Sequence, residues 1–305
     1  ALRVIYDIEA GRMVGVAQNL TLSNDYGVGS QASGQSGVAI GGQMEVVNGT
    51  TWEHEIWSTE ASGKESTAIG TAAHATDYAA VAVGMTSEAS ADGAVAVGAA
   101  STARGDRSVA IGNQSRAYEV LGVAIGANAR AMAARSVALG EMATSGGDGS
   151  LALGGISAAG GGQSVALGWN SLALPAGSLA LGTNSEVAPG AENSVALGAG
   201  SYADRPNTVS VGSPARTHDG SLPTPIAAID RQITHVAAGT EDTDAVNVAQ
   251  LKETGLVDGN GDAVAAVTYD SGKDRISLAG TNGTTLANVR AGTQAGEAVN
   301  VQQFQ

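Results

Sequence analysis

Ser136-Val137-Ala138-Leu139-Gly140 is the stretch that decides the fold of this chain, because it recurs in register along most of it. The repeated unit is an aliphatic residue, Ala, a second aliphatic residue and Gly, and its glycines stand 14 residues apart from Gly70 to Gly182. The first copy begins at residue 38 and the last, a variant, ends at residue 212. A short fixed period is typical of a solenoid in which each repeat forms one coil.

Each coil contains two short strands rather than a helix. The aliphatic pentapeptides are too short for a helix, and glycine every few residues opposes one. After each glycine a second alternation follows, with small residues on either side of a variable one, as in Ser87, Glu88 and Ala89. Such alternation indicates a strand with a small inner face and a free outer face. We therefore predict an all-β parallel solenoid whose coils stack as ladders.

The alternation also assigns each residue of the first strand to a side. We predict that the two aliphatic residues close the coil, as Val137, Leu139, Val165 and Leu167 would do. The Ala between them then faces outward, and its constancy indicates that another backbone packs closely on it; a second copy of the chain is the economical cover. The predicted intersubunit residues are Ala82, Ala96, Ala110, Ala124, Ala138, Ala152, Ala166, Ala180 and Ala196, with Val246 and Leu251 from a later helix.

Composition narrows the classes of protein that this chain can belong to. Aromatic residues make up 3% of the 305 residues and Gly occurs 44 times, which favours thin layers of small side chains. A net charge of −14 disfavours nucleic-acid binding by phosphate neutralisation. The absence of cysteine excludes disulfides and thiol chemistry. No apolar run approaches the ~20 residues of a membrane helix, and a chain that starts with Ala1 is expected to be a fragment.

Interruptions of the repeat predict the domain boundaries. A proline-containing stretch follows Gly212, and Asp244–Lys252 then predicts a short helix with Thr243 or Asp242 as its N-cap. The predicted segments are N-terminal strands and a degenerate first coil at 1–37, the β-roll at 38–212 with an insertion at 43–64, an insertion-bearing neck with the helix at 213–255, a small β unit at 256–285 and a second neck at 286–305.

No catalytic constellation and no cofactor site can be identified. The four histidines show no metal-ligand spacing, and neither HExxH nor GxSxG occurs. Gly198–Ala203 matches GxGxxA but lies in repeat register without a following helix. Asp258–Asp262 resembles the start of a calcium loop, yet Tyr269 occupies the place of the bidentate Glu, so a turn is the better interpretation.

Candidate contact residues lie where the sequence varies outward and in the insertion. The insertion holds two of the three tryptophans, and it is either a hairpin or loop packed on the roll or a protrusion that contacts a ligand. For the outward positions the alternative is that they simply face solvent. The candidates are Trp52, His54, Trp57, Arg116, Arg130, Glu186 and Tyr202.

The coils, followed by Arg231–Gly239 and Asp244–Leu251, resemble the YadA-like head and neck of trimeric autotransporter adhesins. The resemblance covers residues 27–305 and departs from the family pattern at His235, Arg290, Glu297 and Phe304. It implies a homotrimer of left-handed parallel β-rolls, a neck leading to short coiled-coil helices, and display on a Gram-negative outer membrane through a C-terminal anchor absent here. It further implies attachment to host extracellular-matrix proteins or cell-surface receptors.

Two other functions compete with an adhesive head. The chain with its two necks may be read as a passive spacer that projects a more distal head. A trimeric left-handed β-helix acyltransferase is the enzymatic alternative, but those enzymes have a six-residue period and a triangular coil, which the 14-residue period disfavours. We therefore expect an adhesin without catalysis, with the spacer as the alternative.

Overall fold

The structure is a computed structural model, and the chain in it divides into two units, Ala1–Arg231 and Gln232–Gln305. The residues that it describes are 6–7, 12–13, 20–23, 30–47, 54–216, 227–254, 256–261, 272, 274–276 and 284–305.

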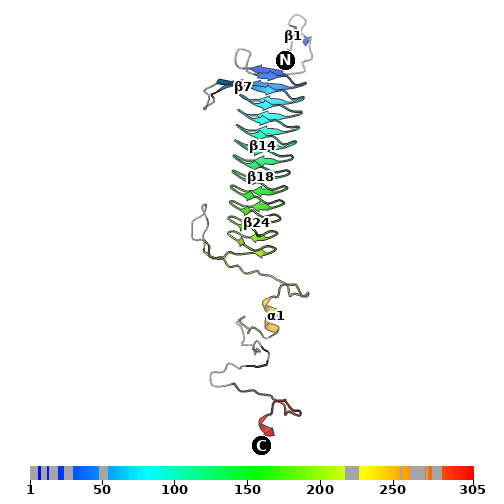
Figure 1. The fold of residues 1–305 in the computed structure, drawn as a ribbon, viewed down its shortest axis with the longest axis vertical. Coiled ribbons are helices and arrows are strands. Elements are labelled where there is room, and N and C mark those ends of the chain that lie inside the picture. The colour runs from blue at the N-terminus through cyan, green and yellow to red at the C-terminus, as the bar shows by residue number, and fades with distance from the viewer. Residues whose placement is uncertain are drawn as a thin grey trace. The chain divides into compact units, whose positions relative to one another are not determined.

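The first unit is a solenoid of two parallel sheets, whose coils stack along one axis (Figure 1). We call the first the aliphatic sheet. Its strands are β3 (Leu20–Ser23), β5 (Val38–Gly41), β8 (Thr67–Ile69), β10 (Val81–Val83), β12 (Val95–Val97), β14 (Val109–Ile111), β16 (Val123–Ile125), β18 (Val137–Leu139), β20 (Leu151–Leu153), β22 (Val165–Leu167), β24 (Leu179–Leu181), β26 (Val195–Leu197) and β28 (Val209–Ser210).

The second, which we call the variable sheet, carries the variable outward residue of each coil. Its strands are β4 (Ser30–Ala32), β7 (His54–Ala61), β9 (His74–Ala75), β11 (Glu88–Ala89), β13 (Thr102–Ala103), β15 (Arg116–Ala117), β17 (Arg130–Ala131), β19 (Thr144–Ser145), β21 (Ala158–Ala159), β23 (Leu172–Ala173), β25 (Glu186–Val187) and β27 (Tyr202–Ala203). Strand β6 (Gln43–Val47) joins it through β7, and β1 (Tyr6–Asp7) pairs separately with β2 (Arg12–Met13).

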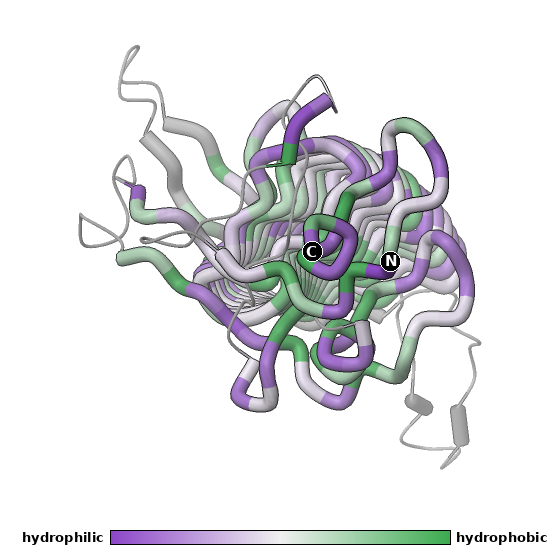
Figure 2. The backbone as a smooth tube through the Cα atoms, turned by 90° about the horizontal axis from the view of Figure 1, so that it is seen from below, coloured by the Kyte–Doolittle hydropathy of each residue, from purple (hydrophilic) through white to green (hydrophobic). Residues whose placement is uncertain are grey.

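The register places equivalent residues of successive coils side by side. Ala138 lies between Ala124 and Ala152 in the aliphatic sheet, each 14 residues away. The one longer coil, which pairs Ala180 with Ala196, places its extra two residues in a turn. Viewed end on, the coils therefore lie one behind another (Figure 2). The predicted solenoid of two-stranded coils is confirmed.

Stacking at this spacing explains the periodic glycine. Gly140 has a φ of +135°, which side chains rarely adopt, and a Cβ there would lie 2.5 Å from the carbonyl oxygen of Gly154 in the next coil. The turns also hold non-glycine residues in the left-handed region, such as Met142 at φ 57°. Buried serines close many turns, and Ser136 donates to the carbonyl of Ala133 at 2.6 Å. These bonds help to hold turns that cost about 1–2 kcal/mol each in backbone strain.

The sides assigned to the first strand were inverted in the prediction. Each predicted intersubunit alanine of the repeat, from Ala82 to Ala196, has 0% of its surface exposed within this single chain, so none of them can contact a partner. The predicted coil residues Val137, Leu139, Val165 and Leu167 are instead half-exposed. A loop of 14 residues encloses too little space for branched side chains on both strands, so the methyl groups of Ala point inward.

The interior consists of small side chains from both sheets. Ala138 and its equivalents meet the Ser and Ala residues that flank each variable residue, such as Ser87 and Ala89. The largest fully buried side chain is that of Val187. Among the described residues, Ser108 Oγ is the only buried side-chain polar atom without a hydrogen-bond partner. The small inner face predicted for the second strand is thus confirmed.

The insertion forms an antiparallel hairpin. Strand β6 pairs with the first half of β7, while Thr59–Ala61 at the end of β7 joins the variable sheet. The buried Thr59 Oγ1 contacts the carbonyl oxygens of Gly42 and Gly70 at 2.9 and 2.6 Å, which ties the base of the hairpin to the roll. Trp52 and the predicted degenerate coil at Asn24–Gly29 lie outside the described residues.

The second unit contains the helix α1 (Val248–Glu253) and the 3-10 helix η1 (Val301–Gln303). The predicted N-cap, Thr243 or Asp242, was wrong, because Asn247 Oδ1 accepts the N–H of Gln250 at 3.1 Å. The predicted β unit at 256–285 lies mostly outside the described residues. Within the parts of the chain that the structure describes, no helix has the length and apolar character to cross a membrane.

The inverted faces make a direct prediction. Ala138→Leu overfills the interior and should destabilise the solenoid by about 1–3 kcal/mol or more, whereas Thr144→Leu, on the outer side of the variable sheet, should change stability by less than about 0.5 kcal/mol. Urea unfolding followed by circular dichroism measures both. Equal losses of stability in the two variants would show that Ala138 does not face a filled interior.

Candidate binding surface

The outward face of the variable sheet carries the side chains that differ from coil to coil. Arg116 lies beside Arg130 in register, with Thr102 and Thr144 as the neighbours beyond them. Two residues further along each strand a second outward column begins, in which Tyr118 follows Arg104 and Met132 follows Tyr118. This face brings the predicted candidates Arg116 and Arg130 together.

An ion pair marks the start of this face. Arg104 Nη2 and Nε donate to the Glu88 carboxylate at 2.9 and 3.0 Å, and Ser90 Oγ donates to it at 3.1 Å. The hydrogen bond from Arg104 lowers the pKa of Glu88 below its ordinary value of 4.5, against the opposing effect of burial. The side chains are 53% and 32% exposed, so the pair contributes at most about 1 kcal/mol.

Arg116 and Arg130 make no ion pair and no side-chain hydrogen bond with any described residue. Arg130 is exposed and Arg116 half-buried, on adjacent strands of the same sheet. Of the prolific carboxylates of this acidic chain, only Glu119 lies within the two coils that they occupy. Both guanidinium groups are therefore available to an anion.

Glu186 and Tyr202, also predicted as contact residues, are covered instead. Arg216 forms an ion pair with Glu186, and its guanidinium carbon lies 4.0 Å from the centre of the Tyr202 ring. The side chains of Arg216 and Glu186 are only 13% and 15% exposed. Burial raises the pKa of Tyr202, and the charge of Glu186 adds to this effect. These residues hold the segment after the last coil rather than a free surface.

The hairpin partly packs on the roll and partly protrudes. The ring of Trp57 lies 6.3 Å from that of His74, yet 41% of Trp57 and 65% of its neighbour Ile56 remain exposed. His54 begins β7 and pairs with Val47 at the far part of the hairpin. The hairpin interpretation is therefore correct for the backbone, and contact with a ligand stays a prediction.

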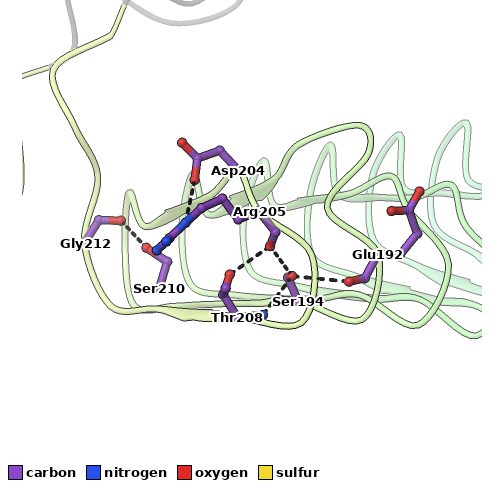
Figure 3. A network of polar contacts seen from close by, with 7 residues as sticks. All are labelled: Glu192, Ser194, Asp204, Arg205, Thr208, Ser210 and Gly212. Carbon is purple, nitrogen blue, oxygen red and sulfur yellow. Dashed lines mark hydrogen bonds and ion pairs between the residues drawn. The ribbon is translucent and has the colours of Figure 1, made fainter.

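The last coil is closed by a polar network that sequence inspection missed (Figure 3). Ser194 Oγ donates to the carbonyl of Arg205 at 2.6 Å and accepts the N–H of Thr208 at 3.2 Å. Thr208 Oγ1 donates to the same carbonyl at 2.8 Å, and Ser210 Oγ donates to Gly212 at 3.0 Å. A cavity of about 450 Å³ lies beside this network, lined by residues of the last coil together with Ser213–Pro214 and Ala228–Asp230.

Arg231 takes the place of the coil that would come next. In the preceding coil the carbonyl of Thr183 accepts the N–H of Gly200 at 2.8 Å. Its equivalent in the last coil, Ala199, accepts instead from the Arg231 guanidinium, which also donates to Val211 and to Ser201 Oγ, the latter at 2.9 Å. A solenoid end exposes unpaired backbone groups, and this side chain satisfies them.

The aliphatic sheet presents the opposite kind of face. The residues on both sides of the buried Ala point outward, so Val, Ile and Leu form two continuous columns along the roll. Exposure is 37% for Ile111, 41% for Leu153 and 42% for Leu197. A continuous apolar face of this length is typical of a protein interface rather than of a solvated surface.

The two necks share one hydrogen-bond pattern, 53 residues apart. The Asn247 amide donates to Val236 and that of Gln250 to Gly239, and Asn300 and Gln303 repeat these bonds with Val289 and Gly292. Asp244 accepts the N–H groups of Thr240 and Glu241, and Glu297 does the same in the second copy.

The neck residues are held by polar bonds alone. None of the described residues from 232 to 305 is buried, and Val246 is 61% exposed. Leu251 is half-exposed. Apolar side chains left this open on a defined backbone need a cover from another chain.

No group of three or more His, Asp or Glu residues that could hold a metal ion occurs in the described part of the chain. The residues that sequence reasoning missed are Arg216, Arg231 and Asn247. For Asn247 a signal existed, since Asn followed three residues later by Gln is a capping-box pattern. Arg216 and Arg231 act across about 30 residues, and nothing local indicates their partners.

Two family profiles match the chain. That of the YadA head domain repeat matches residues 61–87, 89–115, 120–140, 133–155, 159–185 and 190–213. That of the coiled stalk of trimeric autotransporter adhesin matches residues 232–271.

Individual proteins show the same relationship. Adhesin YadA of Yersinia enterocolitica is 40% identical over 80 residues, which are 21% of this chain and 19% of that protein. Autotransporter adhesin EhaG of Escherichia coli O157:H7 is 36% identical over 118 residues, 37% of this chain and 7% of that protein. The crystal structure of the collagen-binding domain of Yersinia adhesin YadA is 34% identical, and the match covers 70% of this chain and 96% of that domain with a TM-score of 0.35. The chain thus spans a fifth or less of the full-length relatives that it matches.

The role of Arg231 can be measured by hydrogen exchange. Arg231→Met removes the donors to Ala199 and Val211 and should destabilise the last coil locally by about 1–3 kcal/mol. The amides of Gly198–Ala203 should then exchange faster, while those of coils near Ala138 stay unchanged. Arg205→Met is the matched control, since its exposed side chain approaches only Asp204. Unchanged exchange near Gly198 would contradict the assignment.

The Glu88–Arg104 pair predicts part of the acid sensitivity. Because the pKa of Glu88 is lower in the folded state, its stabilising contribution is complete above about 4.5 and is lost as the pH falls through the folded-state pKa. Glu88→Gln should therefore lose less stability than the wild type on acidification across that range. Thermal unfolding at several pH values measures this, with Glu141→Gln as the control. A variant as acid-sensitive as the wild type would refute the pKa shift.

Proposed function

The chain belongs to the YadA-like trimeric autotransporter adhesins, and we propose that it is the head and neck of such an adhesin, attaching a Gram-negative bacterium to host extracellular matrix or host cells. The head repeats and the neck carry this proposal, since both match their family profiles in register. The relatives are adhesins by name, and no catalytic step is part of the proposed role.

The proposed assembly is a homotrimer in which the aliphatic sheets face one another. Outward Leu139 and Leu153 belong to the continuous apolar columns, which a solenoid standing alone in water would leave exposed. Burying apolar area contributes about 25 cal/mol per Å², so a face repeated along the whole roll favours association strongly. This role replaces the one predicted for the alanines.

The neck supports the same assembly. Val246 and Leu251, the remaining predicted interface residues, have no cover within the chain. Helix α1 spans six residues, too few to be stable alone in water. Three copies that bury these side chains against one another would supply the missing packing and lead into a coiled coil.

Display on the outer membrane is proposed from family membership. The matched part is a small fraction of each full-length relative, so anchoring is assigned to sequence outside this chain. The wettable face of each roll, the variable sheet, would then point away from the trimer axis toward the host. Repetition of weak contacts over three chains gives avidity.

The alternative function is a passive spacer that projects a more distal head. The second neck favours it, because a chain with two necks has the organisation of one segment among several. The uncovered Arg116 and Arg130 and the protruding Ile56 favour the adhesive role, since a spacer has no need of them.

Light scattering and solid-phase binding test the proposal together. The purified chain should have about three times the mass of 29.9 kDa, and Leu139→Glu with Leu153→Glu should yield monomers because carboxylates are costly at a buried apolar interface. Thr144→Glu, on the variable sheet, is the matched control and should remain trimeric. A monomeric wild type at micromolar concentration would refute the assembly.

The trimer should bind immobilised collagen, fibronectin, laminin or whole host cells, and the monomeric variant should bind at least roughly tenfold more weakly through lost avidity. A variant lacking Met44–Lys64 locates any contribution of the hairpin. A stable trimer that binds none of these surfaces would favour the spacer.

A further inference from the structure

Positive charge is concentrated on one part of the solenoid. Between residues 104 and 135 the chain has five of its 15 basic residues and only two of its 29 acidic ones. The rest of the chain therefore carries all of the excess negative charge. We call these five residues, Arg104, Arg107, Arg116, Arg130 and Arg135, the arginine belt.

The fold places the belt on one side of the roll. Arg116 and Arg130 stand on the outward face of the variable sheet, and Arg104 stands in the column beside them. Arg107 and Arg135 lie in the turn that follows this sheet, where Leu121 occupies the coil between them. The belt thus lies on the variable sheet and its adjoining turn, away from the outward face of the aliphatic sheet.

Only part of the belt is neutralised within the chain. Arg104 pairs with Glu88 and Arg135 with Asp148. No ion pair or side-chain hydrogen bond to a described residue is formed by Arg107, Arg116 or Arg130. Glu119, in the turn after Tyr118, and Asp106, before Arg107, are the two carboxylates within the belt segment. A cluster of unpaired guanidinium groups is unexpected on a chain with this surplus of carboxylates, because like charges on adjacent strands are destabilising.

From this arrangement we infer that the arginine belt binds a sulfated polysaccharide. Guanidinium groups form paired hydrogen bonds with planar or tetrahedral oxyanions. Adjacent strands lie about 4.8 Å apart, so Arg116 and Arg130 offer donors spaced along the roll to an extended anionic chain. Tyr118 and the 49%-exposed Met132 stand beside them and suit the apolar faces of sugar rings.

The charge balance favours this partner over nucleic acid. Duplex DNA carries one charge per about 1.7 Å of its length, and most of those charges would face the acidic coils on both sides of the belt. A polysaccharide with sparser sulfates matches a short belt better. This inference rests on the proposed adhesive function, in which three copies of the belt act together.

Heparin immobilised on a sensor surface is the probe. The trimer should bind it at about 50 mM salt and release it as salt rises, since screening weakens exposed charge contacts. The double variant Arg116→Gln, Arg130→Gln should bind at least roughly tenfold more weakly. Arg205→Gln with Arg275→Gln removes the same charge from exposed sites outside the belt and should leave affinity within about twofold.

Competing probes decide the partner class. Hyaluronan, which lacks sulfate, duplex DNA and polyglutamate should each bind more weakly than heparin. No binding to heparin, equal loss in the two double variants, or tighter binding to any competing probe would overturn the inference. Adhesion to host cells separates the two proposals: adhesion that survives the belt variant overturns the belt alone, whereas absence of adhesion by the wild type overturns the adhesive function.

Discussion

The rest of the structure depends on a steric constraint, namely that each coil encloses space for little more than methyl and hydroxymethyl groups. Ala138 and its equivalents fill that space from one sheet, and Ser and Ala fill it from the other. Gly140 then allows the next coil to approach within contact distance. Because the interior takes only small side chains, every larger aliphatic residue of the repeat is directed outward.

That outward direction links the fold to assembly and binding. The aliphatic sheet becomes a continuous apolar face, and the variable sheet becomes the place where charge and shape differ from coil to coil. A single sequence unit therefore serves the core, the interface and the exposed surface at once. The neck follows the same logic, since polar bonds such as that from Asn247 to Val236 define its backbone and leave Val246 uncovered.

The ends of the solenoid follow a different rule from its middle. Inside the roll each coil satisfies the backbone of its neighbour, so the sequence needs only to repeat. At the last coil Arg231 supplies the missing donors, and Arg216 covers Glu186 and Tyr202. Residues that looked like free contact positions by their place in the repeat are occupied for this reason, whereas Arg116 and Arg130 in mid-roll are not.

The sequence by itself determined the solenoid, its 14-residue period, the two strands of each coil, the hairpin in the insertion and the family, because all of these follow from short-range periodicity and turn chemistry. It did not determine which side of the first strand faces inward, since Val-Ala-Leu alternates equally well in either sense. Only the tertiary structure decided that question, because the enclosed volume depends on how far the opposite sheet lies away. The long-range partners of Arg216 and Arg231 were decided there too, since no local pattern encodes a contact across some 30 residues.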